Sequence, residues 1–345
     1  MPAPLKVATI GAGYFAQFHH AAWAEEPRAA LLAVCDQDLE RAQGFAATYG
    51  AANSYTDPQA MIDAETPDLV DIITPPSTHK ALIEMTAAAG VSTICQKAFC
   101  LSLEEAQAAV ALAQSAGICL VVHENFRFSP WYRETSKLIA DGALGTIYQA
   151  AFRLRPGDGQ GAEAYLDRQP YFQTMERLLV HETAIHYIDT FRFLLGEPVS
   201  VYADLRRLNE HIAGEDAGHI LFDFGAGVRA LFDGNRLSDH SAEDRRLTLG
   251  ELTVEGSLGT LRLTGDGGLL LRQFGKNAER PHSYGLGKGF GGGAVAALQS
   301  HVLDHLIDGA PLENSAQAYV TNLIIEEAVY RSNREGRKVS IAASP

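Results

Sequence analysis

The segment His181-Glu182-Thr183-Ala184-Ile185-His186 gathers two imidazoles and a carboxylate, groups that can move protons or bind a metal. His181 and His186 are five residues apart, which is about 140° around an α-helix. They therefore cannot chelate one metal together as histidines at i and i+4 do. Glu182 and His186 share a helix face, where the carboxylate can orient the imidazole and raise its basicity. A helix-surface ion pair with no chemical task explains this spacing equally well.

A second group of residues has the spacing of a dinucleotide-binding turn. Gly11-Ala12-Gly13-Tyr14-Phe15-Ala16 follows directly on the apolar run Leu5 to Ile10, and Asp36 closes the next apolar run. Gly11 permits the tight bend, Gly13 lets the backbone approach a pyrophosphate, and Ala16 keeps the helix close to the strand. Asp36 is placed to accept hydrogen bonds from both ribose hydroxyls and to repel a 2′-phosphate, which predicts NAD rather than NADP. The alternative is an ordinary strand-to-helix turn.

Two further polar groups follow apolar runs. Thr74-Pro75-Pro76-Ser77-Thr78-His79 comes after the run that begins at Leu69, and Gln96-Lys97-Ala98 comes at the end of the next run. Prolines hold such a loop stiffly where a nicotinamide ribose could rest. We therefore expect cofactor contacts from Thr74, Pro75, Pro76, His79, Gln96 and Lys97. A plain turn and a solvated lysine are the alternatives.

The elements that must position these groups alternate between strand and helix. Strand-like runs at Leu5 to Ile10, Leu31 to Cys35, Leu69 to Thr74, Ser92 to Gln96 and Ile118 to His123 are separated by alanine-rich amphipathic stretches. This alternation predicts a doubly wound parallel sheet covered on both faces, with ligands beyond the carboxyl ends of the strands. We assign it to residues 1–126.

From residue 127 to 345 the pattern changes to a second, α+β domain. Helical stretches are expected at Trp131 to Ala140, Glu182 to Leu195, Ala294 to Ile307 and Ser315 to Asn333, and closely spaced strands at 147–155 and from 199 to 273. Short turns between these strands predict an open, mostly antiparallel sheet with helices on one face. Alternating apolar residues in Val228 to Phe232 suggest that part of the other face is buried too, so we expect a homo-oligomer, a dimer or tetramer.

Length, net charge and cysteine content limit the number of domains and the kinds of binding partner that we expect. With 345 residues, two domains are expected. A net charge of −14 without a basic cluster argues against nucleic acid and anionic lipid surfaces. Cys35, Cys95, Cys100 and Cys119 fit neither a zinc site nor a disulfide framework, so we expect buried free thiols in a reducing compartment. The N-terminal residues lack a basic region followed by an apolar stretch, which favours a cytoplasmic protein without membrane spans.

Two less specific features remain. The glycine-rich stretch from Gly285 to Gly293 lacks the spacing of a phosphate loop and is expected to be a flexible loop or a lid. Four arginines, Arg153, Arg155, Arg168 and Arg177, are candidates to clamp a polar substrate. Salt bridges with Asp158, Glu163, Asp167 and Glu176 account for them equally well.

Taken together, these residues resemble the Gfo/Idh/MocA oxidoreductases over nearly the whole chain. The resemblance rests on Gly11 to Ala16, Asp36, Thr74 to His79, Gln96-Lys97, Arg127-Phe128, Glu182 to Asp189 and Glu326 to Ser332. The segment from Arg155 to His186 resembles most the branch that includes D-apiose dehydrogenases. The family's strand-end motif is usually Glu-Lys-Pro and its helix motif Asp-x-x-x-His, so Gln96, Ala98 and Glu182 depart from the pattern.

The resemblance implies roles for individual residues. Lys97 and His186 form the polar pair that faces the substrate, with His186 as general base, Lys97 as stabiliser of the developing alkoxide, and Glu182 as support for His186. Substrate contacts are expected from Arg127, Arg155, Tyr165, Gln173 and His181. NAD is the expected cofactor, and no metal is expected.

The expected activity is the NAD-dependent oxidation of a free aldose at C1 to a lactone, with D-apiose as a candidate substrate. An inositol or polyol dehydrogenase is the nearest alternative. A redox-neutral glycosidase that uses tightly held NAD, and an NAD-sensing regulator without catalysis, are alternatives from other functional classes.

Overall fold

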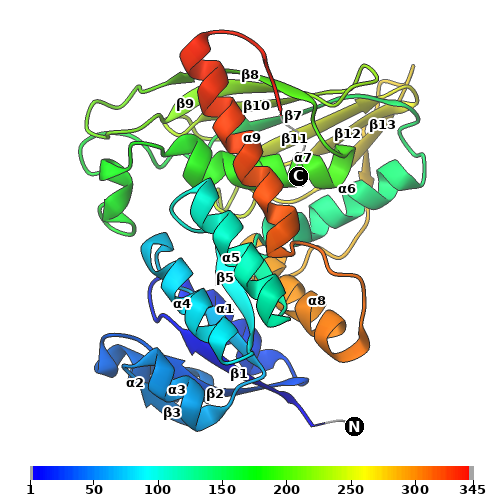
Figure 1. Ribbon diagram of the computed structural model, residues 1–345. Coiled ribbons are helices and arrows are strands. Elements are labelled where there is room, and N and C mark those ends of the chain that lie inside the picture. Colours follow the sequence, from blue (N-terminus) through cyan, green and yellow to red (C-terminus); the bar gives the residue numbers. More distant parts are fainter. Residues whose placement is uncertain (1–2, 342–345) are drawn as a thin grey trace. The chain divides into compact units, whose positions relative to one another are not determined.

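A computed structural model describes residues 3–341 of the chain (Figure 1). The chain forms two compact units, each made of two segments. The first unit contains the described residues up to Asn125 together with Val295–Thr321, and the second contains Phe126–Ala294 together with the described residues from Asn322 onward. The first crossing, between Asn125 and Phe126, lies one residue before the division expected between residues 126 and 127. The return of residues 295–321 to the first unit was not expected.

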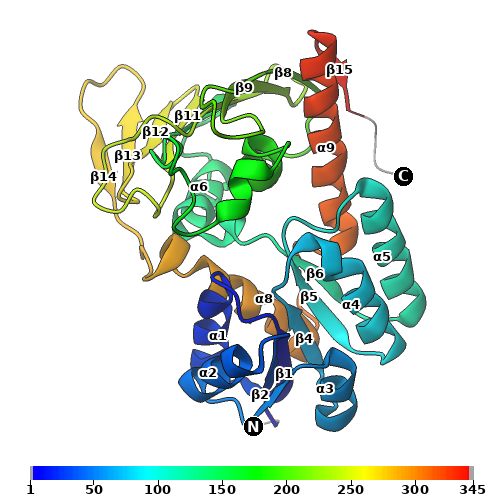
Figure 2. The same cartoon turned by 90° about the vertical axis from the view of Figure 1, so that its left-hand side faces the viewer.

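The first unit is built on a six-stranded parallel sheet in the order β3-β2-β1-β4-β5-β6. Its strands are β1 (Leu5–Ile10), β2 (Ala29–Cys35), β3 (Asn53–Tyr55), β4 (Leu69–Ile72), β5 (Ser92–Gln96) and β6 (Leu120–His123). The connecting helices are α1 (Ala16–Glu25), α2 (Leu39–Tyr49), α3 (Pro58–Glu65), α4 (Pro76–Ala88) and α5 (Leu103–Ala116). Figure 2 shows α1 and α2 on one face of this sheet and α3, α4 and α5 on the other. The strand order reverses between β1 and β4, which is where such sheets bind ligands.

Local sequence signals explain most of these elements. Strand β4 is fully buried, as expected for a strand in the middle of a covered parallel sheet. Three helices begin at side chains that accept a hydrogen bond from the first turn, namely Asp38 before α2, Asp57 before α3 and Ser102 before α5. Helices α2 and α5 end at glycines in the left-handed conformation, Gly50 and Gly117.

The second unit contains a nine-stranded sheet in the order β14-β13-β12-β11-β7-β10-β9-β8-β15. Its strands are β7 (Ile147–Leu154), β8 (Ser200–Arg206), β9 (Ala217–Asp223), β10 (Arg229–Asn235), β11 (Gly250–Gly256), β12 (Gly259–Leu263), β13 (Leu269–Gln273), β14 (Arg280–His282) and β15 (Val339–Ser340). Only β7 and β10 pair in parallel among the strand pairs of this sheet that the structure describes. The expected open, mostly antiparallel sheet is confirmed.

Helices α6 (Pro130–Ala140) and α7 (Ile185–Leu195) lie on one face of this sheet (Figure 2). The ring of Tyr187 in α7 stacks on Phe152 of β7 at a centroid distance of 3.9 Å and lies 5.4 Å from Phe232 of β10. Because these rings are buried, burial of aromatic surface holds α7 against the sheet and fixes the position of its side chains.

The returning segment completes the first unit. Helix α8 (Ala294–Asp308) packs there through the Arg28 guanidinium, which donates to the carboxylate of Asp304 and to the Ser300 hydroxyl. Helix α9 (Ala316–Glu335) starts in the same unit, where Gln317 accepts a hydrogen bond from Gln114 of α5. These contacts join residues far apart in sequence, so no local sequence pattern predicts them.

The thiols agree with expectation. All four cysteines are free, and Cys35, Cys95 and Cys100 are buried, whereas Cys119 is half-buried. Burial raises the pKa of Cys35 and Cys100 to about 12, so these thiols stay protonated. Within residues 3–341 no helix is both long enough and apolar enough to cross a bilayer.

Candidate functional site

The glycine turn lies at the point where the strand order reverses. Gly11 has φ +112°, and a Cβ placed on it would lie 2.5 Å from the Ile73 carbonyl oxygen and 3.2 Å from Thr74. Any side chain at this position would therefore collide with the end of β4. A Cβ on Gly13 would meet nothing within 4 Å, so the backbone there is open to a ligand. Ala16 is fully buried at the start of α1, as expected for close packing of the helix on the strand.

Asp36 is held next to this turn by backbone donors. One carboxylate oxygen accepts from the amide of Ala12 at 2.8 Å, and the other accepts from the amide of Asp38 at 2.9 Å. Each oxygen keeps a second acceptor direction, which suits the two hydroxyls of a ribose. The Arg41 guanidinium lies 4.0 Å from the carboxylate.

The loop after β4 is fixed by its own side chains. The Thr78 hydroxyl donates to the Thr74 hydroxyl at 2.6 Å, Pro75 precedes α4, and Pro76 is its first residue. His79 is fully buried, and its Nε2 donates to the Thr74 carbonyl at 2.8 Å. Burial lowers the pKa of His79 to about 4, so the ring is neutral at physiological pH. His79 thus holds the Thr74 carbonyl in place, and contact of His79 with a cofactor stays a prediction.

Gln96 ends β5 and is buried, whereas Lys97 directly after it is half-buried. The side-chain oxygen of Gln96 accepts from the Lys97 backbone amide at 2.7 Å. The following Lys97–Ala98 peptide bond is cis. Tyr14 is exposed at the glycine turn, and Phe15 packs against Phe18 at a centroid distance of 5.2 Å.

These residues fit a dinucleotide. The backbone at Gly13 has space for a ligand, whereas the backbone at Gly11 packs against Ile73. The Asp36 carboxylate is held beside the turn, and the N-terminus of α1 follows directly. Helix N-termini favour phosphate because their first amides lack partners within the helix. The first unit therefore offers a site for the pyrophosphate and for one ribose of a dinucleotide.

The histidine segment in the second unit differs from the helix expected at 182–195. Residues Leu179–Ala184 form a π-helix, η3, and α7 begins only at Ile185. In a π-helical turn the backbone bonds run from i to i+5, so the α-helical spacing used to relate Glu182 to His186 does not hold across this segment. Among the described residues, no group of three His, Cys, Asp or Glu side chains is placed to hold a metal ion.

His186 and His181 have different surroundings. The His186 ring is buried and lies parallel to the ring of Phe126, with 3.8 Å between centroids and an interplanar angle of 4°. The Nδ1 of His181 lies 2.8 Å from a carboxylate oxygen of Glu326, and the His181 side chain is 23% exposed. His181 is therefore oriented by a buried carboxylate that sequence reasoning had grouped only with the closing motif.

Besides His181, two of the expected substrate contacts form ion pairs within the second unit. Arg127 donates to both carboxylate oxygens of Asp189, at 2.7 and 2.6 Å. Arg155 donates to the backbone and the carboxylate of Asp233, each at 2.7 Å. These bonds hold the two guanidinium groups in place, and contact of either one with a substrate stays a prediction.

The other two expected contacts shape the loop after β7. Gln173 donates to the carbonyls of Ala162 and Ala164, at 2.8 and 2.9 Å. Tyr165 is buried in a small core that includes Phe172. Of the pairings considered for the arginine group, Arg168 with Asp158 is present, at 3.4 Å.

Arg236 is a residue that sequence reasoning missed. It is buried, donates to the Asp158 carboxylate at 2.7 Å and to the Thr183 hydroxyl at 2.6 Å, and lies over the ring of Tyr165. It thereby ties the loop after β7 to η3, the turn that leads into His186. A single arginine near the end of a strand carries no local signal of this role.

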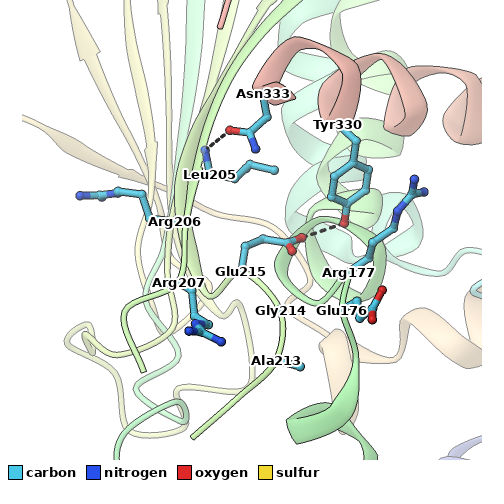
Figure 3. A pocket seen from close by; sticks show the side chains of 10 residues that line it. All are labelled: Glu176, Arg177, Leu205, Arg206, Arg207, Ala213, Gly214, Glu215, Tyr330 and Asn333. Atoms are coloured by element: carbon cyan, nitrogen blue, oxygen red, sulfur yellow. Dashed lines mark hydrogen bonds between the residues drawn. The ribbon is translucent and has the colours of Figure 1, made fainter. Parts of the chain in front are cut away.

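A hollow of about 360 Å³ also lies in the second unit, and His186 is not among the residues that line it (Figure 3). In Figure 3 the Tyr330 hydroxyl points toward Glu215, to which it donates at 2.7 Å, and Arg177 lies beside the Tyr330 ring. Arg177 is also paired with Glu327. Arg206 and Arg207 also line the hollow, whereas none of the expected catalytic residues does.

The doubly wound sheet with a dinucleotide turn, followed by an open-sheet unit that presents a buried histidine, defines a nicotinamide-dependent oxidoreductase. Two family models match the chain. "Oxidoreductase family, NAD-binding Rossmann fold" matches residues 5–124, and "GFO/IDH/MocA C-terminal domain" matches residues 132–262. The chain belongs to the Gfo/Idh/MocA family and is an NAD-dependent oxidoreductase that acts on CH–OH groups.

Full-length relatives agree with this assignment. The chain is 35% identical to a D-apiose dehydrogenase of Paraburkholderia graminis, over 97% of this chain and 89% of the relative. It is 32% identical to a D-apiose dehydrogenase of Rhizobium rhizogenes, over 98% of both chains. A crystal structure of an oxidoreductase from Agrobacterium radiobacter in complex with NAD+, L-tartaric acid and magnesium matches with a TM-score of 0.87 and 30% identity, over 98% of this chain and 99% of that one.

Proposed function

We propose that this protein is an NAD-dependent sugar dehydrogenase that oxidises a free aldose at C1 to a lactone, with D-apiose as the first candidate. The full-length likeness to two D-apiose dehydrogenases from different bacteria carries the proposal. The intact dinucleotide turn and the buried, oriented His186 support it.

In the proposed reaction one hydride and one proton leave the substrate, and each has a separate acceptor. NAD, when bound, supplies the acceptor for the hydride that leaves C1. His186 takes the proton of the C1 hydroxyl as the C–H bond breaks, because an alkoxide without a base nearby forms too rarely. The Lys97 ammonium stabilises the negative charge that develops on that oxygen. We assign to Glu182 the electrostatic support of His186 that the family resemblance implies, because the π-helix removes the argument from a shared helix face.

The experiment is a screen of NADH formation by the purified protein over D-apiose, other branched pentoses, aldoses and inositols. We expect the largest kcat/KM with a free aldose, and His186→Ala is expected to lower kcat by about 10² or more. Turnover without net NADH would indicate the redox-neutral glycosidase, and an inositol as the best substrate would replace the aldose assignment. An unchanged rate in the His186→Ala variant would remove the role of this residue.

A further inference from the structure

A buried carboxylate lies in the middle of the first sheet, away from the glycine turn. Asp71 in β4 is fully buried, and one of its oxygens accepts from His19 Nδ1 and from the Trp23 indole, both at 2.8 Å. The Gln299 side chain adds a longer donor contact at 3.5 Å. Burial raises the pKa of the Asp71 carboxyl, whereas the hydrogen bonds from His19 and Trp23 lower it. One oxygen that accepts from two donors, as this one does, is typical of an ionised carboxylate.

From this carboxylate, hydrogen bonds lead to the backbone of Lys97. His19 Nδ1 contacts Asp71, and His19 Nε2 lies 3.0 Å from the side-chain nitrogen of Gln96. The side-chain oxygen of Gln96 accepts from the Lys97 amide at 2.7 Å. His19 is fully buried and Gln96 is 8% exposed, so water competes little for these bonds.

The direction of each bond in this series is determined. A backbone amide only donates, so the Gln96 group facing Lys97 must be its oxygen. Its NH2 group therefore faces His19, and because that group only donates, His19 Nε2 must be an unprotonated acceptor. The remaining proton lies on Nδ1 and is donated to Asp71. His19 is thus neutral, in one tautomer, although it contacts an ionised carboxylate.

Two further imidazoles, of His123 and His20, lie near His19, and the buried Cys95 thiol interacts with the same Asp71 carboxylate. The His123 ring of β6 lies 3.9 Å from the His19 ring between centroids. His20 follows in α1, with Nδ1 2.8 Å from the Ala16 carbonyl and Nε2 2.8 Å from the Thr9 hydroxyl. Burial lowers the pKa of His20 to about 4, so it adds no positive charge at neutral pH.

We propose that His19 is a positioning residue, which holds the Gln96 amide in one orientation and thereby sets the backbone at Lys97. This inference rests on the role proposed for Lys97. It also explains why an amide suits position 96. A carboxylate there accepts only, so it would repel the unprotonated Nε2 and would require His19 to carry protons on both nitrogens.

The variants Gln96→Glu and His19→Phe test this series of bonds. Gln96→Glu keeps the shape of the side chain but removes its donor. His19→Phe keeps a ring and removes the acceptor. Gln114→Glu is the matched control, because it makes the same change of charge at an exposed position of the same unit.

The first measurement is independent of any substrate. In full-length protein labelled with 15N-histidine, long-range 1H–15N spectra report which ring nitrogens carry protons, and His19→Phe identifies the His19 signals. We expect His19 protonated at Nδ1 alone in the wild type and in Gln114→Glu, and protonated at both nitrogens in Gln96→Glu. With 15N-lysine, the Lys97 amide resonance is expected to move in Gln96→Glu and His19→Phe, and to stay in place in Gln114→Glu.

The second measurement is the pH profile of kcat for NADH formation. In Gln96→Glu, loss of one of the two protons expected on His19 creates a repulsion that the wild type lacks, so the pH profile of this variant is expected to differ from that of the wild type, with a fall in activity on the alkaline side. Both variants are expected to lower kcat about tenfold at neutral pH, with little change in KM for NAD.

The outcomes separate the two proposals. Nε2 protonated in wild-type His19, or a Lys97 amide that does not move in Gln96→Glu, would overturn the positioning role. The expected spectra without any sugar-dependent NADH formation would leave the positioning role standing and would remove the proposed function. A pH profile of Gln96→Glu identical to that of the wild type would show that Lys97 placement does not depend on His19.

Discussion

The imidazole of His186 lies parallel to the phenyl ring of Phe126, with 3.8 Å between ring centroids. The stack covers one face of the imidazole with a rigid apolar partner, which restricts the rotation of the imidazole ring. A base held in this way keeps its nitrogen atoms in a constant direction as its charge changes.

Phe126→Leu is expected to lower kcat by up to about tenfold, because an aromatic pair contributes about 0.5–1.5 kcal/mol and the leucine leaves the imidazole freer to rotate. Phe191→Leu is the control, since Phe191 lies in the same helix and packs on Phe222 without touching His186. Similar losses of Tm in the two variants, with a fall in kcat only in Phe126→Leu, would support the role of the stack. Equal kcat values would contradict it.

Asp36→Ser is expected to raise kcat/KM with NADP relative to NAD by about tenfold, or ~1.4 kcal/mol. The substitution removes the carboxylate that repels a 2′-phosphate and leaves Arg41, which lies 4.0 Å from that carboxylate, to attract the phosphate. The double variant Asp36→Ser, Arg41→Ala is expected to lose most of this gain. Steady-state kinetics with both cofactors test it, and an unchanged preference for NAD would remove the role given to Asp36.

Asp189→Asn is expected to lower the free energy of unfolding by about 3 kcal/mol, because it removes a buried carboxylate from the Arg127 guanidinium, which is itself only 13% exposed. Asp189 also accepts from Asn322 at 2.9 Å. Glu197→Gln is the control. It removes an exposed carboxylate paired with Arg192 and is expected to cost less than about 1 kcal/mol. Urea unfolding compares the two, and equal losses would show that burial of the Arg127 pair does not matter.

Acid is expected to destabilise the first unit through two buried histidines. Burial lowers the pKa of His20 and His79 from 6.5 to about 4. Between these values the unfolded chain binds more protons than the folded chain, so the free energy of unfolding falls as the pH falls through this window and levels off above it.

The measurement is urea unfolding at about pH 7.5 and about pH 5, which lie above and within this window. His79→Gln keeps an amide donor for the Thr74 carbonyl but does not titrate, so the difference between the two pH values should shrink. His211→Gln, at an exposed position, should leave the difference unchanged. A difference that persists in full in His79→Gln would assign it to other groups.

We also propose that the protein is a homo-oligomer through the open face of its nine-stranded sheet. Tyr202, Leu221, Leu231 and Ala151 lie opposite one another on neighbouring strands, and Tyr202 and Leu221 are exposed. Such a row of apolar side chains is suited to pairing with a second copy. Light scattering at micromolar concentration is expected to give a multiple of 37.2 kDa for the wild type and a smaller mass for Leu221→Arg. Leu258→Arg, outside this row, is the control, and a monomeric wild type would refute the proposal.

The features that could be predicted from the sequence are those marked by patterns among residues close together in the chain. Gly11, Gly13 and Asp36 are read from their spacing to two apolar runs, and the structure places them together because a βαβ unit leaves little freedom. Strand β3 is a short edge strand of polar residues, so no periodicity marks it. The π-helix before His186 and the bonds of Arg236 depend on tertiary contacts, which no local pattern encodes.

The same limit applies to the predicted substrate contacts. The family resemblance points to Arg127 and the group of arginines to Arg155, but their bonds to Asp189 and Asp233 join positions far apart in the chain. Sequence reasoning identified residues that matter locally and had no means to tell a ligand contact from an internal ion pair.

The interleaved order of the two units has a consequence during synthesis on the ribosome. Asp71 and Arg28 receive their partners Gln299 and Asp304 only after residues 126–294 have been translated. Synthesis of the first unit therefore begins first but is completed late. A nascent chain released at residue 126 would expose the Asp71 and Arg28 side chains, which Gln299 and Asp304 contact in the folded protein. Premature termination anywhere before residue 321 leaves both halves unfinished, so a stop codon in the middle of the gene should yield no independently folded fragment.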